Sequence, residues 1–503
     1  MSLVAMVPEV FAPGGVLARA DGHFQPRDGQ TQMAIAVAET IAEGGALVVE
    51  AGTGVGKTYA YLVPALLSGE RVLLSTATKA LQDQLFARDM PRLAQILGLP
   101  VRMALLKGRA SYLCLHRMQQ ARLDIQAQDR GVARVLAKVE DWSRQTVSGD
   151  LAELTGLDER SPVIPLVTST RENCLGSSCP RFRECHVHRA RREALAADIV
   201  VINHHLFFAD VAVRESGMAE LLPTVRVVVF DEAHQINETG VQFLGTQMST
   251  GQWMDFARDL LIAGLQHARG LADWAGLSQL LELSARDLRL VVGNAIFQGA
   301  NGVAAGARVR WTEEAPEGLS DAAWHAALRA LGSACAQSLE ALDTVSEISP
   351  DLERLYERGS ALLARLARFS GPCQADAVRW LDVGNQLRLI ESPLDIADAM
   401  RTRILTSPAE TSEGEAWPEE PAANMSRAWI FTSATLGADE ALTWFTERAG
   451  LKDARILRVA SPFDYARQAA LYVPRQLPSP ADPSHSRSVA EWVALAAEPL
   501  GGC

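Results

Sequence analysis

Residues 51–58, Ala-Gly-Thr-Gly-Val-Gly-Lys-Thr, form a phosphate-binding pattern between a short apolar run and an expected helix. Glycines there let backbone N–H groups turn inward around phosphate oxygens, and the amino end of the helix adds partial positive charge. Lys57 would neutralise β- and γ-phosphate oxygens, and the Thr58 hydroxyl would ligate Mg²⁺. The flanking strand and helix favour this over a chance glycine-rich turn. The expected nucleotide-binding residues of the loop are Gly52, Thr53, Gly54, Val55, Gly56, Lys57 and Thr58.

Two adjacent acids, Asp231 and Glu232, follow the apolar run 227–230. Ligands of open α/β sheets bind at the carboxyl ends of such strands, which argues against a merely solvated turn. Asp231 would hold Mg²⁺ through water, while Glu232 would orient and deprotonate an attacking water. His234 would couple this site to neighbouring segments. The expected catalytic set is therefore Lys57, Asp231, Glu232 and His234.

Four cysteines lie between the phosphate loop and the acid pair, spaced C-x59-C-x4-C-x5-C: Cys114, Cys174, Cys179 and Cys185. Seven cysteines in 503 residues are too few for a disulfide scaffold. Thiolates suit an iron–sulfur cluster or Zn²⁺, and spacing alone does not separate the two. The paired C-x2-C hooks common in zinc sites are absent.

Charge is distributed unevenly along the chain. The net charge of −12 argues against a wholly basic nucleic-acid-binding surface, but residues 101–192 carry 16 Lys/Arg against 10 Asp/Glu. Five arginines surround the last cysteines there: Arg181, Arg183, Arg189, Arg191 and Arg192. They would contact DNA phosphates, or they are a solvated helix face. A polyanion site is therefore compatible with an acidic protein.

These residues need a scaffold, and apolar runs predict one. Buried strands are expected at 46–49, 71–74, 198–202, 225–230 and 429–432. Strands alternating with helical patterns are typical of a parallel α/β sheet. The alternation breaks at about 107–192 and again at 243–403, where apolar residues recur every three or four positions. We expect one α/β core with two insertions, the second all-helical.

The motifs, taken in order, resemble those of DEAH-type superfamily 2 helicases. Residues 24–33 resemble the adenine-recognising Q-motif, with Arg27 and Gln30 in the matching places. Residues 75–82, STATKALQ, resemble motif Ia, and residues 432–435, TSAT, resemble motif III. The segments around the cysteines, KGRxxYLC at 107–114 and NCLGxxC at 173–179, resemble the iron–sulfur helicases of the XPD/DinG group. The resemblance covers essentially the whole chain.

This resemblance implies roles for further residues. ATP would lie on the phosphate loop with its adenine against Arg27 and Gln30, and Thr58 and Asp231 would hold Mg²⁺. The four cysteines would carry a [4Fe–4S] cluster, and Ser433 and Thr435 would couple hydrolysis to DNA. Eight residues are expected to contact DNA: Ser75, Thr76, Lys79, Gln82, Arg181, Arg183, Asn203 and His204.

The resemblance also divides the chain. A RecA-like motor domain is expected in three pieces, 1–106, 193–242 and 426–460. A cluster domain at 107–192 and an Arch-like helical insertion at 243–425, with an acidic loop at 406–425, would interrupt it. Residues 461–503 would be the stub of a second RecA-like domain, far shorter than the about 100 to 150 residues of a typical domain. We therefore expect a truncated helicase, impaired because the second domain's arginine finger is missing.

The leading functional hypothesis is an ATP-dependent DNA helicase of 5′-to-3′ polarity that acts in DNA repair or replication restart. Polarity and pathway rest on the resemblance alone. One alternative is a non-catalytic nucleic-acid-binding or interaction protein that retains ATP binding. Another is a metabolic P-loop enzyme with structural zinc.

Partners and compartment follow from the same reasoning. We expect single-stranded DNA and forked or tailed duplexes as substrates, with replication or repair proteins as further partners, and a monomer. The N-terminus lacks the basic start of a secretory signal, which predicts a cytoplasmic protein. Apolar stretches fall short of the about 18 residues of a membrane span, so no membrane is expected.

Overall fold

The computed structural model describes residues 1–124, 130–158, 160–214, 222–298, 307–373, 377–405, 426–469, 471, 473–480 and 482–498. Two compact units, residues 1–460 and 461–503, divide the chain. The segment 406–425, expected to be an acidic loop, lies outside the described residues.

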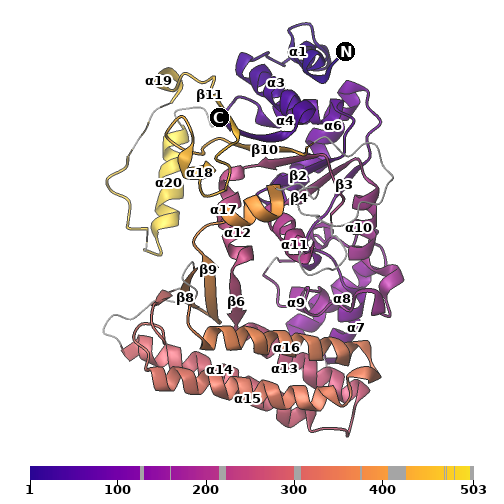
Figure 1. Cartoon of the computed structure of the whole chain (residues 1–503), viewed down its shortest axis with the longest axis vertical. Coiled ribbons are helices and arrows are strands. Elements are labelled where there is room, and N and C mark those ends of the chain that lie inside the picture. Colours follow the sequence, from indigo (N-terminus) through magenta and orange to yellow (C-terminus); the bar gives the residue numbers. More distant parts are fainter. Residues whose placement is uncertain are drawn as a thin grey trace. The chain divides into compact units, whose positions relative to one another are not determined.

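A seven-stranded sheet with only parallel neighbours forms the centre of the first unit (Figure 1). Its order is β11-β1-β10-β5-β2-β4-β3. The strands are β1 (Gly45–Ala51), β2 (Val72–Thr76), β3 (Met103–Leu105), β4 (Ile199–Asn203), β5 (Val227–Asp231), β10 (Ala428–Ser433) and β11 (Arg455–Val459). The parallel α/β sheet is confirmed, and β3 and β11 extend it at its two edges.

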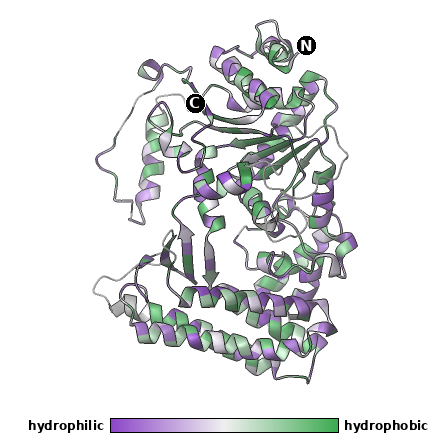
Figure 2. Ribbon diagram, in the orientation of Figure 1, coloured by the Kyte–Doolittle hydropathy of each residue, from purple (hydrophilic) through white to green (hydrophobic). Residues whose placement is uncertain are grey.

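Helices cover both faces of this sheet, which is why its central strands are mostly buried and apolar (Figure 2). Leu47 and Val49 of β1 pack in one core with α3 (Asp28–Glu43) and α4 (Lys57–Leu67). Val48, which points the other way, packs in a second core with residues of α11 (His204–Arg214) and α12 (Ile236–Leu244). The strand that leads into the phosphate loop, β1, is therefore packed against helices on both faces of the sheet.

One segment, Leu3–Ala20, is long and apolar enough to span a membrane by length and composition, with a mean hydropathy of 1.4. It forms two helices, α1 (Leu3–Phe11) and α2 (Val16–Ala20). Val7, Phe11 and Leu17 are buried in the same core as α3. Core helices and signal sequences pass the same test, so the segment is weak evidence for a span.

The first insertion interrupts the sheet between β3 and β4, which pair side by side. Its helices are α7 (Leu115–Asp124), α8 (Arg130–Ser143), α9 (Ile164–Val167) and α10 (His186–Ala196). Leu113, Leu136 and Val167 belong to a small core of its own. Helix α10 packs instead in the second core of the motor sheet, through Val187 and Ala194.

The second insertion is mainly helical, but the expectation of an all-helical segment was wrong. Its long helices are α13 (Thr250–His267), α14 (Trp274–Gln298), α15 (Asp321–Asp343) and α16 (Pro350–Ser370). A four-stranded antiparallel sheet, ordered β6-β9-β8-β7, accompanies them. Its strands are β6 (Thr246–Ser249), β7 (Ala307–Trp311), β8 (Ala377–Val383) and β9 (Leu387–Pro393).

Buried charges hid this small sheet from sequence analysis. Arg379 of β8 and Glu391 of β9 are 6% and 1% exposed and form an ion pair. Charged residues at core positions break the apolar alternation that marks a strand. The pair is tolerated because each charge finds its partner inside the fold.

The second unit contains α19 (Tyr465–Gln468) and α20 (His485–Ala497). Neither helix has a buried residue. Leu471, Val473 and Leu495 are largely exposed. Within the described part of this unit, no residue belongs to a hydrophobic core cluster.

Candidate active site

The phosphate loop connects β1 to the amino end of α4, as expected. Gly54 and Gly56 adopt left-handed backbone conformations, with φ of 87° and 86°. A Cβ atom at Gly56 would lie 2.2 Å from the Gln30 amide nitrogen, so only glycine fits. The Lys57 Nζ atom lies 3.4 Å from the Ala51 carbonyl oxygen, which keeps the ammonium group beside the loop.

Arg27 and Gln30, the expected adenine contacts, brace the phosphate loop in this structure. The Arg27 guanidinium donates to the Gly54 carbonyl at 2.7 Å, and the Gln30 amide donates to the Gly56 carbonyl at 2.9 Å. Gln30 starts the buried face of α3, whereas Arg27 directly precedes the helix. The two side chains thus link α3 to the turn that would receive phosphates.

Asp231 ends β5 inside the protein, with only 9% of its surface exposed. Burial raises the pKa of its carboxyl to about 6, and the neighbouring Glu232 adds to the shift against the opposing effects of Tyr61 and Lys57. A buried carboxylate near a lysine and a threonine hydroxyl suits a divalent cation, which would compensate its charge. Thr58 and Asp231 therefore fit the expected Mg²⁺ site.

Tyr61 is a site residue that sequence reasoning missed. Its hydroxyl donates to Asp231 Oδ2 at 3.1 Å, and its ring is fully buried. Burial, followed by the charge of Asp231, raises the pKa of Tyr61 well above its ordinary value, so the phenol stays a donor. A signal was available, because Tyr61 lies three residues after Thr58 on the same face of α4.

Glu232 is positioned by contacts from two strands. Its backbone is left-handed, with φ of 55°, which turns the chain sharply after β5. The Ser433 hydroxyl, at the end of β10, lies 3.4 Å from Glu232 Oε2 and 2.8 Å from His234 Nδ1. The expected coupling residues Ser433 and His234 therefore meet beside Glu232, the expected catalytic carboxylate. Thr435 is exposed, and its backbone N–H donates to Ser433 Oγ at 3.5 Å.

Glu50, just before the phosphate loop, is a second residue that the motifs did not reveal. Its Oε2 accepts from the backbone N–H groups of Leu436 and Gly437, at 2.7 and 3.1 Å. Its Oε1 pairs with Arg458 of β11 at 2.8 Å. An acid inside an otherwise apolar strand was the available signal. Glu50 joins the phosphate loop to the chain that follows motif III.

Half of the expected DNA contacts are buried side chains: Ser75, Thr76, Gln82 and His204, at 0 to 1% exposure. As they stand, these side chains are closed to a DNA strand, because protein covers them. His204 Nδ1 lies 2.7 Å from Ser75 Oγ, and burial lowers the pKa of the imidazole to about 3. His204 is therefore a neutral structural link between β2 and the end of β4.

The other four expected DNA contacts lie nearer the surface. Lys79, at the start of α5 (Lys79–Gln84), and Arg183 are exposed. Arg181 is half-buried and pairs with Glu184 at 3.1 Å. Asn203 caps the next helix by accepting from the Leu206 N–H at 2.9 Å. Lys79 and Arg183 remain the side chains of this set best placed to meet a phosphate.

The four expected cluster ligands are free thiols of intermediate burial. Burial raises the pKa of Cys114 to about 11, and the thiols of Cys179, Cys174 and Cys185 add to the shift. The Arg109 guanidinium donates to Cys174 Sγ at 2.9 Å. No three potential ligands among the described residues are grouped tightly enough to hold a metal ion. The donor set, four thiols with cationic neighbours, fits a thiolate-bound cluster by its chemistry.

Comparisons with known proteins agree with this geometry. Residues 31–138 match the family DEAD/DEAH box helicase. The chain is 38% identical to the ATP-dependent DNA helicase YoaA of Escherichia coli, covering 95% of this chain and 71% of that protein. It is 37% identical to YoaA of Haemophilus influenzae over 94% of this chain and 69% of that one. It is 41% identical to the ATP-dependent helicase DinG of Mycobacterium tuberculosis over 47% of this chain and 37% of that one.

Among solved structures, a chain titled truncated XPD aligns with 85% of this chain and 98% of its own, at 14% identity and a TM-score of 0.42. The identity to the two YoaA proteins extends over nearly the whole chain and most of theirs. With the phosphate loop, the acid pair and the motif III contact in place, the chain belongs to the YoaA/DinG family of DEAD/DEAH-box helicases.

Proposed function

We propose that the protein is an ATP-dependent DNA helicase that couples hydrolysis of Mg-ATP to movement along single-stranded DNA. One observation carries the proposal: the Ser433 hydroxyl meets both Glu232 and His234. Hydrolysis needs a positioned carboxylate, and here Ser433 of motif III contacts the Glu232 carboxylate. A shift of β10 against β5 would therefore move the group that activates water.

In this mechanism each residue has a separate task. The loop N–H groups and Lys57 would bind the β- and γ-phosphates, and Asp231 and Thr58 would hold the magnesium ion. Mg²⁺, when bound, neutralises charge that develops on the phosphate oxygens. Glu232 takes the proton of the attacking water, and Ser433 and His234 hold its carboxylate in place. Tyr61 holds the Asp231 carboxylate in place by donating to Oδ2.

Finer features of the proposal draw on the family. We propose 5′-to-3′ polarity, forked or tailed duplexes as substrates, a role in DNA repair or replication restart, and a cytoplasmic monomer. Four cysteines within one insertion, three of them between Cys174 and Cys185, support a [4Fe–4S] cluster over isolated core cysteines, which rarely gather in one segment. Iron and sulfide analysis with visible spectroscopy tests the cluster, and a colourless protein that contains zinc would contradict it.

The decisive experiment measures ATP hydrolysis by the whole protein with and without a single strand. We expect DNA to raise turnover at least about tenfold, and Lys57→Ala to lower it by roughly 10² or more because charge stabilisation is lost. Lys452→Ala, which removes an exposed lysine of the same unit, is the matched control. ATP binding without DNA-stimulated turnover would instead favour a non-catalytic nucleic-acid-binding protein. Unwinding of duplexes with a 5′ or a 3′ tail then tests polarity.

A further inference from the structure

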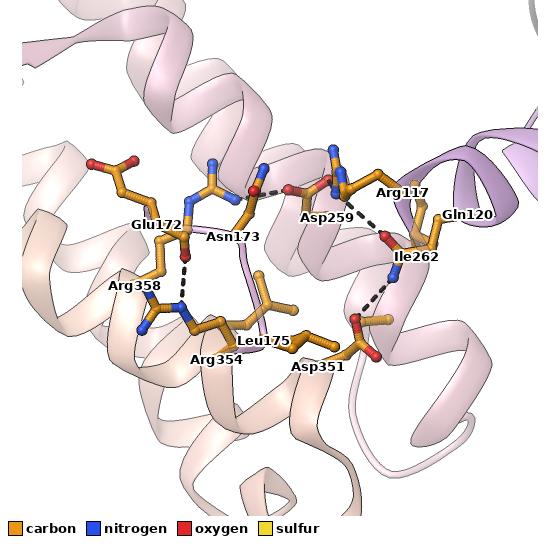
Figure 3. Close-up of a pocket in the computed structure, with 12 residues that line it drawn as sticks. Arg117, Gln120, Glu172, Asn173, Leu175, Asp259, Ile262, Asp351, Arg354 and Arg358 are labelled. Atoms are coloured by element: carbon orange, nitrogen blue, oxygen red, sulfur yellow. Dashed lines mark hydrogen bonds and ion pairs between the residues drawn. The ribbon is translucent and has the colours of Figure 1, made fainter. Parts of the chain in front are cut away.

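A polar cavity lies between the cysteine-bearing insertion and the helical insertion (Figure 3). The first insertion contributes Arg117 and Gln120 of α7 and the loop from Glu172 to Leu175. The second contributes residues of α13, among them Asp259, and residues of α16, among them Asp351, Arg354 and Arg358. None of the lining residues belongs to the phosphate loop or the acid pair, so the cavity is distinct from the nucleotide site.

One wall of the cavity is the chain that leads to Cys174. Arg354 Nε donates to the Glu172 carbonyl at 2.9 Å, and the same guanidinium donates to the Arg171 carbonyl. The Glu172 side chain pairs with Arg365 at 2.7 Å. Arg354 of α16 thus donates hydrogen bonds to two successive backbone carbonyl groups just before Cys174. Because these carbonyl groups belong to the main chain and not to side chains that can change rotamer, the hydrogen bonds hold the backbone in place.

The opposite wall is α7, which begins directly after Cys114. Arg117 donates to Asp259 Oδ1 at 3.1 Å, and Arg358 donates to Asp259 Oδ2 at 2.7 Å. Burial favours a higher pKa for Asp259, but the two arginines outweigh it and hold the pKa below its ordinary value. A charged Asp259 therefore joins α7 to both α13 and α16, as Figure 3 shows.

The two segments held by these contacts carry Cys174 and Cys114, two of the four proposed cluster ligands, from distant parts of the sequence. Metal centres require ligand positions correct to about 0.2 Å, and loss of outer-shell partners typically lowers metal affinity 10- to 100-fold. We infer that the helical insertion positions the Cys114 and Cys174 segments, through Arg354, Arg365 and Asp259, and thereby sets how firmly the cluster is held. This inference rests on the proposed cluster.

The test compares iron release from the whole protein in the presence of a chelator, followed by the decay of visible absorbance and by iron content. Arg354→Ala removes both backbone contacts, Arg354→Lys keeps a cation that can donate to one carbonyl, and Arg365→Ala removes the Glu172 ion pair. Arg286→Ala removes an exposed i,i+4 pair on α14 of the same insertion and is the control. Far-ultraviolet circular dichroism of each variant checks that the helices persist.

We expect iron release about tenfold faster in Arg354→Ala, partly restored in Arg354→Lys, and unchanged in Arg286→Ala. Release at the wild-type rate from both Arg354→Ala and Arg365→Ala would overturn the inference. If Arg354→Ala fails to fold, the rate for Arg365→Ala decides alone. A wild-type protein without iron would refute the cluster itself, so the two failures are distinguishable.

Discussion

The hydroxyl of Ser433 lies 2.8 Å from Nδ1 of His234, which joins the end of β10 to the turn that follows β5. Thr432 pairs with Asp231 in the sheet register, so Ser433 extends just past the strand that carries the metal carboxylate. The same hydroxyl lies 3.4 Å from Glu232 Oε2. One small side chain therefore connects motif III to both functional residues of the acid turn.

Removing either side of this contact should weaken the response to DNA. We expect Ser433→Ala to lower DNA-stimulated turnover about fivefold, since a lost hydrogen bond of about 1 kcal/mol loosens the position of Glu232. The KM for ATP should change less than about twofold, because the phosphate loop is untouched. Steady-state hydrolysis at saturating single strand measures both quantities.

His234→Ala provides the second half of a double-mutant cycle. If the two residues act through their contact, the double variant is no slower than the slower single variant. Additive losses would show that Ser433 and His234 act separately and would contradict the coupling. Thr443→Ala is the matched control, because it removes a side-chain hydrogen bond made by an exposed hydroxyl of the same unit.

Local motifs made most of the site predictable. The phosphate loop, the acid pair and motif III each depend on a short run of residues next to a buried strand, and parallel pairing brings such strand ends to one edge. Tyr61 and Glu50 escaped because their roles depend on partners 170 and 386 residues away. Contacts of that range are set by the fold and leave no spacing to recognise.

Burial was the property that sequence patterns predicted least well. The family resemblance implied a DNA contact for His204, but α11 starts at His204 and the side chain is fully buried. The antiparallel sheet of the helical insertion escaped for a related reason, because Glu391 occupies a core position of β9. In both cases a specific partner offsets the cost of burying a polar group, and the partner is distant in sequence.

Replacing Asp231 by asparagine should stabilise the metal-free protein while abolishing hydrolysis. Its folded pKa of about 6 lies above the ordinary value of 3.8, so the ionised carboxyl costs roughly 3 kcal/mol above pH 6, at about 1.4 kcal/mol for each unit. As the pH falls from 6 towards 3.8, the carboxyl takes up a proton and this cost disappears. Urea unfolding with a chelator present should therefore show a larger gain for Asp231→Asn at pH 8 than at pH 5.

The control for this prediction is Asp343→Asn, at an exposed position near the end of α15. It should change the unfolding free energy little at either pH. An equal gain for Asp231→Asn at both pH values would show that the carboxyl carries no buried charge. Added Mg²⁺ should reduce the gain at pH 8, because the wild-type carboxylate then has a cation partner.

His204→Ala should destabilise the fold without weakening DNA binding directly. The change leaves the buried Ser75 hydroxyl without its partner and opens a cavity, which together should lower the unfolding free energy by about 2 to 4 kcal/mol. Because the pKa of His204 is about 3 in the folded protein but about 6.5 in the unfolded chain, the unfolded imidazole takes up a proton as the pH falls to 6, so the loss should be smaller at pH 6 than at pH 9. Urea unfolding across that range measures it.

Lys79→Ala is the matched contrast for DNA binding, since Lys79 is exposed beside the same strand. Lys79→Ala should reduce the slope of log affinity for single-stranded DNA against log salt concentration by about one. His204→Ala should leave this slope unchanged. Fluorescence anisotropy at several salt concentrations separates the two variants. A smaller slope for His204→Ala would mean that His204 meets a phosphate after all.

Glu50 should prove necessary for the geometry of the nucleotide site. Glu50→Gln keeps an oxygen that accepts from the Leu436 and Gly437 N–H groups but loses the ion pair with Arg458, whereas Glu50→Ala loses both. We expect Glu50→Ala to lower the unfolding free energy by about 2 to 3 kcal/mol, because two part-buried N–H groups lose their acceptor. Its KM for ATP should rise several-fold, since β1 runs directly into the phosphate loop. Arg458→Ala should match Glu50→Gln in both measurements. If Glu50→Ala behaves like Glu50→Gln, the backbone contacts contribute nothing and the side chain serves only as the partner of Arg458.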